Sequence, residues 1–352
     1  MESTGELAWF RTELLRSLLH PNDFARSLAR EHYGLAGVLV ALLSGAAASI
    51  AIDALVLATK GFVFLAFLPQ LVIDAVFLGA RLAVTVAVIA TAVHYALRAS
   101  RRAGLGLDQA FTAFSFALVP LVLAPIAAVL VLLPELIVAA ALVVLAIVLR
   151  TVIGIGLNLR ALLPPAVALA VFVATIVLGA LVLQDQVSRV RYSLYAAVPQ
   201  LVPELAATPM AGARAEAADF AITLPPGWTN ATTGLRGEAA RYVSPTADLR
   251  VARARGLPLA TADSYADTIE AIEDRGLESA WSERSVVRIA GVIVVDDRYG
   301  GVLDGRRIVY RQFTAVPTTQ GFALIFHYVD PPDQRAALDE AASIAVTWRL
   351  TR

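Results

Sequence analysis

A nearly unbroken run of Ala, Val, Leu and Ile over residues 35–183 constrains this chain more than any other feature. Hydrophobic residues make up 58% of the 352 residues and charged residues 16%, against roughly 45–50% and about 25% in soluble domains. From Asp185 onward, charged residues return at ordinary density. A chain of this length has room for about two domains. We therefore expect hydrocarbon to solvate the first half and water the second.

Five windows in the first half are long enough to cross a bilayer, because about 20 apolar residues in a helix span roughly 30 Å of hydrocarbon. An additional apolar stretch, residues 61–73, is too short to cross alone and contains Pro69. It is either an interfacial or re-entrant segment or an extension of the second span. The predicted spans are residues 35–58, 75–97, 111–133, 136–157 and 162–183.

The loop charges predict an orientation, because short cytoplasmic loops are enriched in Lys and Arg. The loops on the other side of the membrane hold only Lys60, after the first predicted span, and Glu135, in the turn between the third and fourth predicted spans. We therefore expect a protein integral to the plasma or inner membrane, with a cytoplasmic N-terminus and an extracytoplasmic C-terminal domain. The arginines on the predicted cytoplasmic side are Arg11, Arg16, Arg26, Arg30, Arg98, Arg101, Arg102, Arg150 and Arg160.

Three motifs in the membrane half are similar to one family. They are Ala-Val-His-Tyr-Ala-Leu-Arg at residues 92–98, a basic glycine loop at 101–106, and Phe-x-x-Phe-Ser-x-x-Leu-Val-Pro at 111–120. Together with the Pro and aromatic lead-in at 19–26, they resemble the Yip (Ypt-interacting protein) membrane domain over residues 15–183. The resemblance implies a five-span helical bundle with a cytoplasmic N-terminus, and it implies architecture more than activity.

Charged groups within or beside spans point to function by default, because lipid makes them costly. We expect Asp53, Asp74 and Arg81 to form such an intramembrane polar cluster, and Asp74 and Arg81 are seven apart on one predicted helix face. A proton or ion relay and a structural ion pair are both open, and we favour the ion pair. Pro120 and Pro125 predict a helix kink in the third span, either a hinge or a fixed bend, and we favour the bend.

Past the membrane half, the chain divides into a linker and a domain. Residues 185–217 are rich in Ala and Pro and predict a tether without a long helix. Residues 218–352 predict an α+β domain with an antiparallel sheet and two helices. The remaining segments are a cytoplasmic amphipathic stretch at 1–34 and the transmembrane domain at 35–184. Predicted strands are 220–224, 240–243, 249–254, 285–289, 292–295, 308–315 and 322–328, with helices at 262–275 and 333–346.

The opening Phe-x-Ile-x-Leu-Pro-Pro-Gly-Trp at 220–228 and the closing Thr347-Trp348 resemble the PsbP-like fold, which includes the DcrB and LpqN lipoproteins of the cell envelope. That resemblance implies binding of a partner or an apolar ligand near a membrane rather than catalysis. No ligand residue of that family carries over to this chain.

Chemical motifs are sparse. The chain has no cysteine, and its four histidines show no metal-ligand spacing. Asp296-Asp297 suits calcium by residue type, but a solvated turn is the simpler interpretation. A net charge of zero without a basic cluster argues against nucleic acid. We expect no catalytic, cofactor-binding or metal-binding residue.

These observations favour a non-enzymatic membrane protein whose outer domain binds a protein partner or a lipid-like ligand, with the bundle as anchor and possible subunit interface. Two alternatives stay open. One is a transporter or permeation accessory built on Asp53, Asp74 and Arg81. The other is an envelope enzyme, which would require His327 to meet acidic residues of other strands in the outer domain.

Overall fold

The computed structural model describes residues 3–20, 34–99, 106–235, 237–273 and 275–351. The chain forms two compact units, Met1–Val190 and Arg191–Arg352. Most of the lead-in motif at 19–26 and of the basic loop at 101–106 lies outside the described residues, as do Arg26, Arg30, Arg101 and Arg102.

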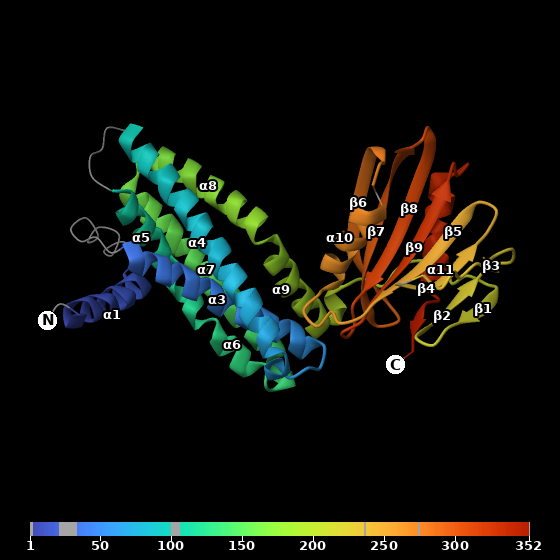
Figure 1. The fold of residues 1–352 in the computed structure, drawn as a ribbon, viewed down its shortest axis with the longest axis horizontal. Helices are drawn as coiled ribbons and strands as arrows, with labels where there is room; N and C mark the ends of the chain where they lie inside the picture. Colours follow the sequence, from blue (N-terminus) through green and yellow to red (C-terminus); the bar gives the residue numbers. More distant parts are fainter. Residues whose placement is uncertain (1–2, 21–33, 100–105, 236, 274, 352) are drawn as a thin grey trace. The chain divides into compact units, whose positions relative to one another are not determined.

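The N-terminal unit is helical (Figure 1). Its first helix packs Trp9, Phe10 and Leu14 around Phe116 and Val119. The α-helices of this unit and its short 3-10 helices (η) are α1 (Ser3–Leu19), α3 (Gly34–Thr59), η2 (Phe64–Phe67), α4 (Leu68–Ala99), α5 (Leu107–Ala117), η3 (Val119–Leu123), α6 (Pro125–Leu130), η4 (Pro134–Leu136), α7 (Ile137–Leu162), α8 (Pro165–Val182) and α9 (Gln184–Ala197), which continues past Val190.

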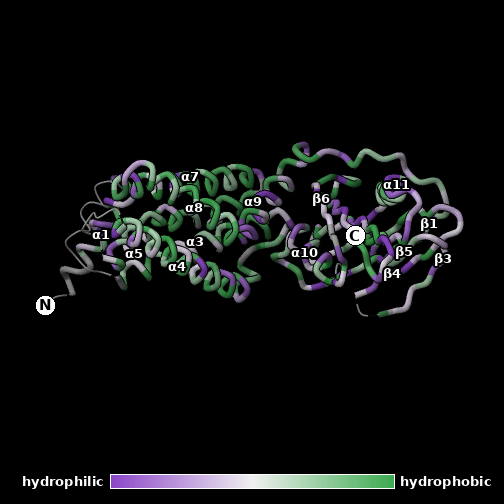
Figure 2. The backbone as a smooth tube through the Cα atoms, turned by 90° about the horizontal axis from the view of Figure 1, so that it is seen from above, coloured by the Kyte–Doolittle hydropathy of each residue, from purple (hydrophilic) through white to green (hydrophobic). Residues whose placement is uncertain are grey.

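Five helical segments in the described chain are long and apolar enough to cross a membrane, and they confirm the five predicted windows: Leu35–Thr59, Leu65–Ala99, Leu107–Leu130, Ile137–Leu162 and Pro165–Val182. Apolar residues run along these helices in Figure 2. On α8, Leu169, Val173, Val177 and Leu181 recur every fourth residue, and each is more than half exposed. Such a stripe belongs to an apolar environment, because a water-facing helix surface is polar.

Prolines define two details of this unit. The 61–73 stretch forms η2 and the start of α4, so it lengthens the second helix; Pro69 lies in the first turn of α4, where proline removes no intrahelical bond. Pro120 lies in η3 and Pro125 begins α6. The third predicted span is thus two α-helical segments joined by a 3-10 turn.

The C-terminal unit contains a seven-stranded sheet in the order β3-β4-β5-β9-β8-β7-β6, antiparallel throughout. A second, three-stranded sheet has the order β1-β2-β10. The seven predicted strands are all present; β1, β3 and β10 are additional. The strands are β1 (Ala213–Glu216), β2 (Phe220–Leu224), β3 (Thr229–Asn230), β4 (Glu238–Val243), β5 (Ala247–Ala254), β6 (Glu278–Ile289), β7 (Val292–Leu303), β8 (Arg306–Ala315), β9 (Gly321–Val329) and β10 (Arg349–Leu350).

Two helices, α10 (Ala262–Glu273) and α11 (Gln334–Ala345), cover opposite faces of the long sheet (Figure 1). Side chains alternate along a strand, and on β8 Ile308 and Tyr310 pack with Tyr265 and Ile269 of α10. Val309 and Phe313 pack instead with α11 and with β2. Both faces of the sheet are therefore buried, one under α10 and one under α11 and the small sheet.

The predicted linker is more structured than its composition suggested. Helix α9 occupies its first part, and Pro199, Pro203 and Pro209 all follow the helix end at Ala197. In the C-terminal unit, residues 203–205 then run beside β6, where the Arg288 amide donates to the Pro203 carbonyl at 2.8 Å and the Leu205 amide donates to the Arg288 carbonyl at 3.0 Å.

Candidate functional site

Two of the three predicted cluster residues share one arginine. Arg189 on α9 donates from Nη1 to Asp53 Oδ1 at 2.5 Å and to Asp74 Oδ2 at 3.2 Å. The Asp53 side chain is fully buried, and Ser49, one turn before it on α3, donates to Asp53 Oδ2 at 3.2 Å. Helices α3, α4 and α9 thus meet at one buried polar group.

Arg81 does not take part in this group. Its guanidinium pairs with Asp185 at 3.2 Å and donates to the Val182 carbonyl at the end of α8. Although Asp74 and Arg81 lie on one helix, the structure assigns them to two separate ion pairs, each closed by a residue of α9.

The Asp53, Asp74 and Arg189 arrangement favours a structural role. Breaking a buried pair by removing one partner is strongly destabilising, because it leaves an uncompensated charge. Both carboxylates accept hydrogen bonds from Arg189, and Gln70 also donates to Asp74 at 3.2 Å. The role of Arg189 in this group could not be predicted from the sequence. The residue lies 136 positions from Asp53, in a segment predicted to be a linker.

Asp296 and Asp297 are buried in the middle of β7, so the interpretation of this pair as a solvated turn is wrong. They point to opposite faces, as the alternation of strand residues requires. Arg311 of β8 holds Asp296 with two bonds, at 2.9 Å and 2.7 Å, and also donates to the Leu338 carbonyl of α11 at 2.6 Å. This pair anchors α11 to its face of the sheet.

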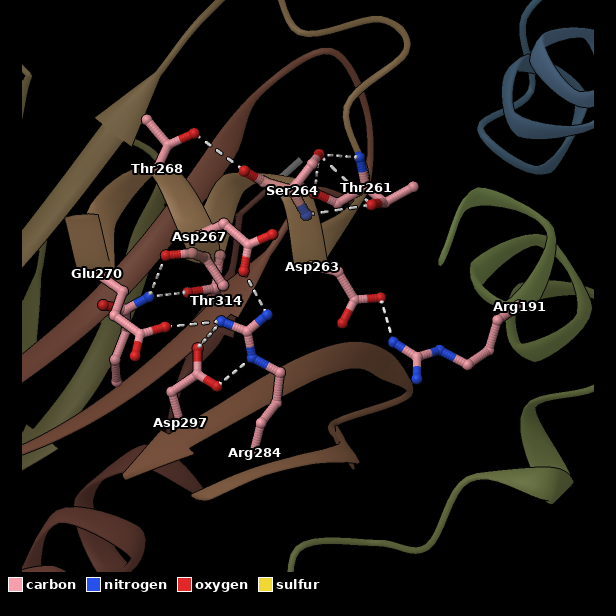
Figure 3. Close-up of polar contacts among 12 residues, drawn as sticks. Arg191, Thr261, Asp263, Ser264, Asp267, Thr268, Glu270, Arg284, Asp297 and Thr314 are labelled. Carbon is pink, nitrogen blue, oxygen red and sulfur yellow. Dashed lines mark hydrogen bonds and ion pairs between the residues drawn. The ribbon is translucent and has the colours of Figure 1, made fainter. Parts of the chain in front are cut away.

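On the other face, Arg284 of β6 joins the sheet to α10 (Figure 3). Its Nε donates to Asp297 Oδ1 at 2.5 Å, its Nη2 donates to Glu270 at 3.0 Å, and its Nη1 pairs with Asp267. Burial raises the pKa of Asp297 to about 6, against the opposing influence of Arg284. One guanidinium thus binds three carboxylates from two elements.

A further contact continues this row along α10. Asp263, in the first turn, pairs with Arg191 at 2.9 Å, and Thr261 and Ser264 exchange hydrogen bonds at the helix start (Figure 3). Acidic side chains spaced three and four residues apart occupy one helix face. Asp267 and Glu270 are matched by Arg284 of the sheet and Asp263 by Arg191 of α9, so these pairs fix α10 to the elements beside it.

His327 of β9 stacks on Tyr310 at 4.8 Å between ring centroids, and Tyr310 stacks on Tyr299 at 4.9 Å. Its register partner on β5 is Asp248, whose carboxylate accepts bonds from Arg241 Nε at 3.1 Å and 3.0 Å. Burial lowers the pKa of His327, which disfavours its charged form. Asp248, the acid opposite His327, is thus bound to Arg241.

Among the described residues, no group of three or more His, Cys, Asp or Glu side chains is placed to hold a metal ion. The charged side chains gathered inside the C-terminal unit are therefore best explained as ion pairs between elements.

No family model and no curated protein matches this chain. Among solved structures, a crystal structure from Bacteroides thetaiotaomicron VPI-5482 is similar at 16% identity and a TM-score of 0.29, covering 41% of this chain; this chain spans 50% of its length. The solution structure of cyanobacterial PsbP (CyanoP) from Synechocystis sp. PCC 6803 is similar at 12% identity and a TM-score of 0.30, covering 40% of this chain and 92% of that one. Likeness at these TM-scores carries no argument on function.

Proposed function

We propose that this chain is an integral membrane protein whose C-terminal domain binds a protein partner or a lipid-like ligand, without catalysing a reaction. The observation that carries the membrane location, on which the rest of the proposal builds, is the exposed apolar stripe on the long helices. Leu169, Val173 and Leu181 of α8 belong to this stripe. Burying one such side chain contributes about 1.5–3 kcal/mol, so the helices gain stability only where hydrocarbon or another protein covers them.

The composition of the C-terminal unit supports binding over catalysis. Asp296, Asp297 and Asp263 are buried, and each is paired with an arginine of another element. Catalytic acids and bases need an ionisable group that faces a substrate. The PsbP-like resemblance of residues 218–349 points the same way, and the Yip-like resemblance of residues 15–183 supports an anchoring bundle.

The orientation also belongs to the proposal. With five spans and arginine-rich loops on one side, the N-terminus lies in the cytoplasm and the C-terminal domain outside it. Arg98, in the last turn of α4, and Arg160, in the last turn of α7, are the described charges at span ends that support this orientation most directly.

Purification of the full chain from native membranes in a mild nonionic detergent tests the binding function. We expect a protein or a lipid to remain with the chain in a fixed molar ratio, identified by mass spectrometry of the intact complex. A chain that purifies alone, with neither lipid nor protein retained, would contradict the proposal.

A permeation function is the second candidate, and the buried Asp53, Asp74 and Arg189 group is the observation that favours it. It predicts proton or ion flux in proteoliposomes that Asp74→Asn abolishes. Flux that is absent, or that is unchanged in the variant, removes this candidate and leaves the group as a structural ion pair.

A further inference from the structure

The three-stranded sheet carries a cavity of about 290 Å³ on its outer face. Phe220, Ile222 and Leu224 of β2 point into the core, so Ala221 and Thr223 point the opposite way. The lining residues come from the segment before β1, from β1 and β2, and from the chain after α11: Pro209, Met210, Arg214, Ala221, Ile222, Thr223, Val346, Thr347 and Arg349.

Two arginines flank this cavity because of the strand register. Arg214 of β1 lies opposite Thr223 and Arg349 of β10 lies opposite Ala221. Since Ala221 and Thr223 share the outer face, both arginines project from that same face, one on each side of β2. A central strand with one arginine on each neighbour places two positive charges around a small opening.

Both guanidinium groups keep donors for a ligand. Arg214 pairs through Nε with Glu216 at 2.6 Å, and both side chains are 65% exposed. Arg349 donates from Nη1 to the carbonyls of Val346 and Trp348, at 2.9 Å and 2.8 Å. Within the described residues, these bonds leave Nη1 and Nη2 of Arg214 and Nε and Nη2 of Arg349 without a protein acceptor. By contrast, Arg311 and Arg241 each hold a carboxylate with two nitrogens.

The floor of the cavity combines apolar and hydroxyl side chains and is tightly bound to the fold. Ala221 is 4% exposed. The Thr347 hydroxyl accepts from the Thr223 amide at 2.8 Å and donates to the Ile344 carbonyl at 2.6 Å. Met210 is held by its amide, which donates to the Ser343 carbonyl at 2.8 Å. The site therefore combines a fixed floor, to which Met210 and Val346 contribute apolar surface, with a cationic rim.

We propose that this cavity binds the phosphate group of a phosphorylated ligand, with the ester carbon against Met210 and Val346. Arginine suits phosphate because its planar donor fork matches two phosphate oxygens. The volume of about 290 Å³ lies just below the range of ligand pockets, roughly 300–1,000 Å³, which fits a phosphate and its first carbons but not a whole large ligand. This site rests on the proposed binding function and names its ligand class. A lipid headgroup and a soluble phosphate ester share this chemistry.

Calorimetric titration of the full chain, in a phosphate-free nonionic detergent at low salt, tests the site. Inorganic phosphate and a short-chain phosphatidic acid are the two probes. We expect saturable binding of at least one, weakened about tenfold or more in Arg214→Ala with Arg349→Ala. Binding of phosphatidic acid at least tenfold tighter than of phosphate identifies a lipid source, and comparable binding of the two identifies a soluble ester.

Three more variants separate the site from general charge effects. Glu216→Gln removes the carboxylate that competes for Arg214, so it should tighten binding about two- to fivefold, the effect of one exposed ion pair. Ala221→Leu fills the floor and should weaken binding while keeping both charges. Arg335→Ala is the matched control, because Arg335 is 92% exposed on α11 and outside the cavity lining.

The site is wrong if neither probe binds saturably, if the double arginine variant binds as the unaltered chain does, or if Arg335→Ala weakens binding as much. Each variant is first checked for the unaltered circular dichroism spectrum, and Glu216→Gln, which should gain affinity, cannot give its expected result by misfolding. A chain that retains a copurified partner but fails this titration keeps the proposed binding function and loses only this cavity.

Discussion

At the scale of single residues, Arg189 is the side chain on which the polar group of the helical unit depends. It is 19% exposed, and it neutralises the fully buried Asp53 while also contacting Asp74. Removing one partner of a buried ion pair costs more than the pair itself contributes, because the remaining charge stays desolvated.

Arg189→Met is therefore expected to lower the free energy of unfolding by on the order of 3 kcal/mol, measured by denaturant titration in detergent micelles. Adding Asp53→Asn should recover much of the loss, since it removes the stranded charge. Arg160→Met, at an exposed position of α7, is the control and should change little. Equal effects of Arg189→Met and Arg160→Met would refute the structural role of the group.

Asp297 makes the C-terminal unit sensitive to pH. Burial raises its pKa to about 6, above the value of about 3.9 in an unfolded chain. Between these values the folded state binds a proton that the unfolded state does not, so the contribution of Asp297 to stability is present below about pH 4 and is lost as pH rises through about 6.

We expect Asp297→Asn to remove this part of the slope when the free energy of unfolding is measured from pH 4 to pH 7. Asp339→Asn, whose side chain is 72% exposed on α11, should keep the slope. If the slope were the same in the unaltered chain and in Asp297→Asn, the assigned pKa direction would be incorrect.

The ion pairs between side chains could be predicted from the sequence only in part. The solvated-turn interpretation of Asp296 and Asp297 failed because burial depends on the strands alongside β7, which a local pattern does not contain. Asp53, Asp74 and Arg81 stood out because charges are rare in an apolar stretch, whereas Arg189 lay among other charged residues and gave no such contrast.

At the scale of elements, the closest approach of two long helices is made by glycines. A Cβ placed on Gly45 of α3 would lie 2.6 Å from the Gly79 Cα, and one on Gly79 of α4 would lie 2.7 Å from the Leu42 carbonyl oxygen. These contacts are with backbone, which cannot rotate away. Small residues permit such close helix packing.

Gly45→Ala and Gly79→Ala should each force α3 and α4 apart and lower the free energy of unfolding by about 1–3 kcal/mol. Gly179→Ala on α8 is the matched control, because nothing lies within 4 Å of its added Cβ and alanine favours a helix by roughly 0.5–1 kcal/mol over glycine. The three variants can be compared by thermal unfolding in one detergent. If Gly179→Ala were destabilised while Gly45→Ala was unaffected, the close contact between α3 and α4 would be contradicted.

Elements with a strong pattern were predicted and short or polar ones were not. The five apolar windows and the seven longer strands have clear periodicity, and all are present. Strand β1 is Ala-Arg-Ala-Glu, and β10 has two residues, so both depend on pairing with β2 rather than on their own sequence. Helix α9 was not predicted, because the prolines of residues 185–217 were taken to prevent a long helix in the whole segment. All three prolines lie after the end of α9.

At the scale of the whole molecule, the arginine distribution makes a prediction about sidedness. Alkaline phosphatase fused after Arg352 should be active in a bacterial host, because that enzyme matures only outside the cytoplasm, and a fluorescent protein fused before Met1 should be bright. A C-terminal phosphatase without activity, in a chain that is stably expressed, would reverse the proposed orientation.

The proposed membrane location and the functions that follow from it require lipid to cover the helical unit. The most direct test is extraction of membranes from cells that express the full chain, first with alkaline carbonate and then with a nonionic detergent. We predict that the chain stays in the carbonate pellet and enters solution only with detergent. A chain that carbonate releases, and that stays folded and monodisperse in plain buffer, would contradict the membrane assignment and the functions proposed on it.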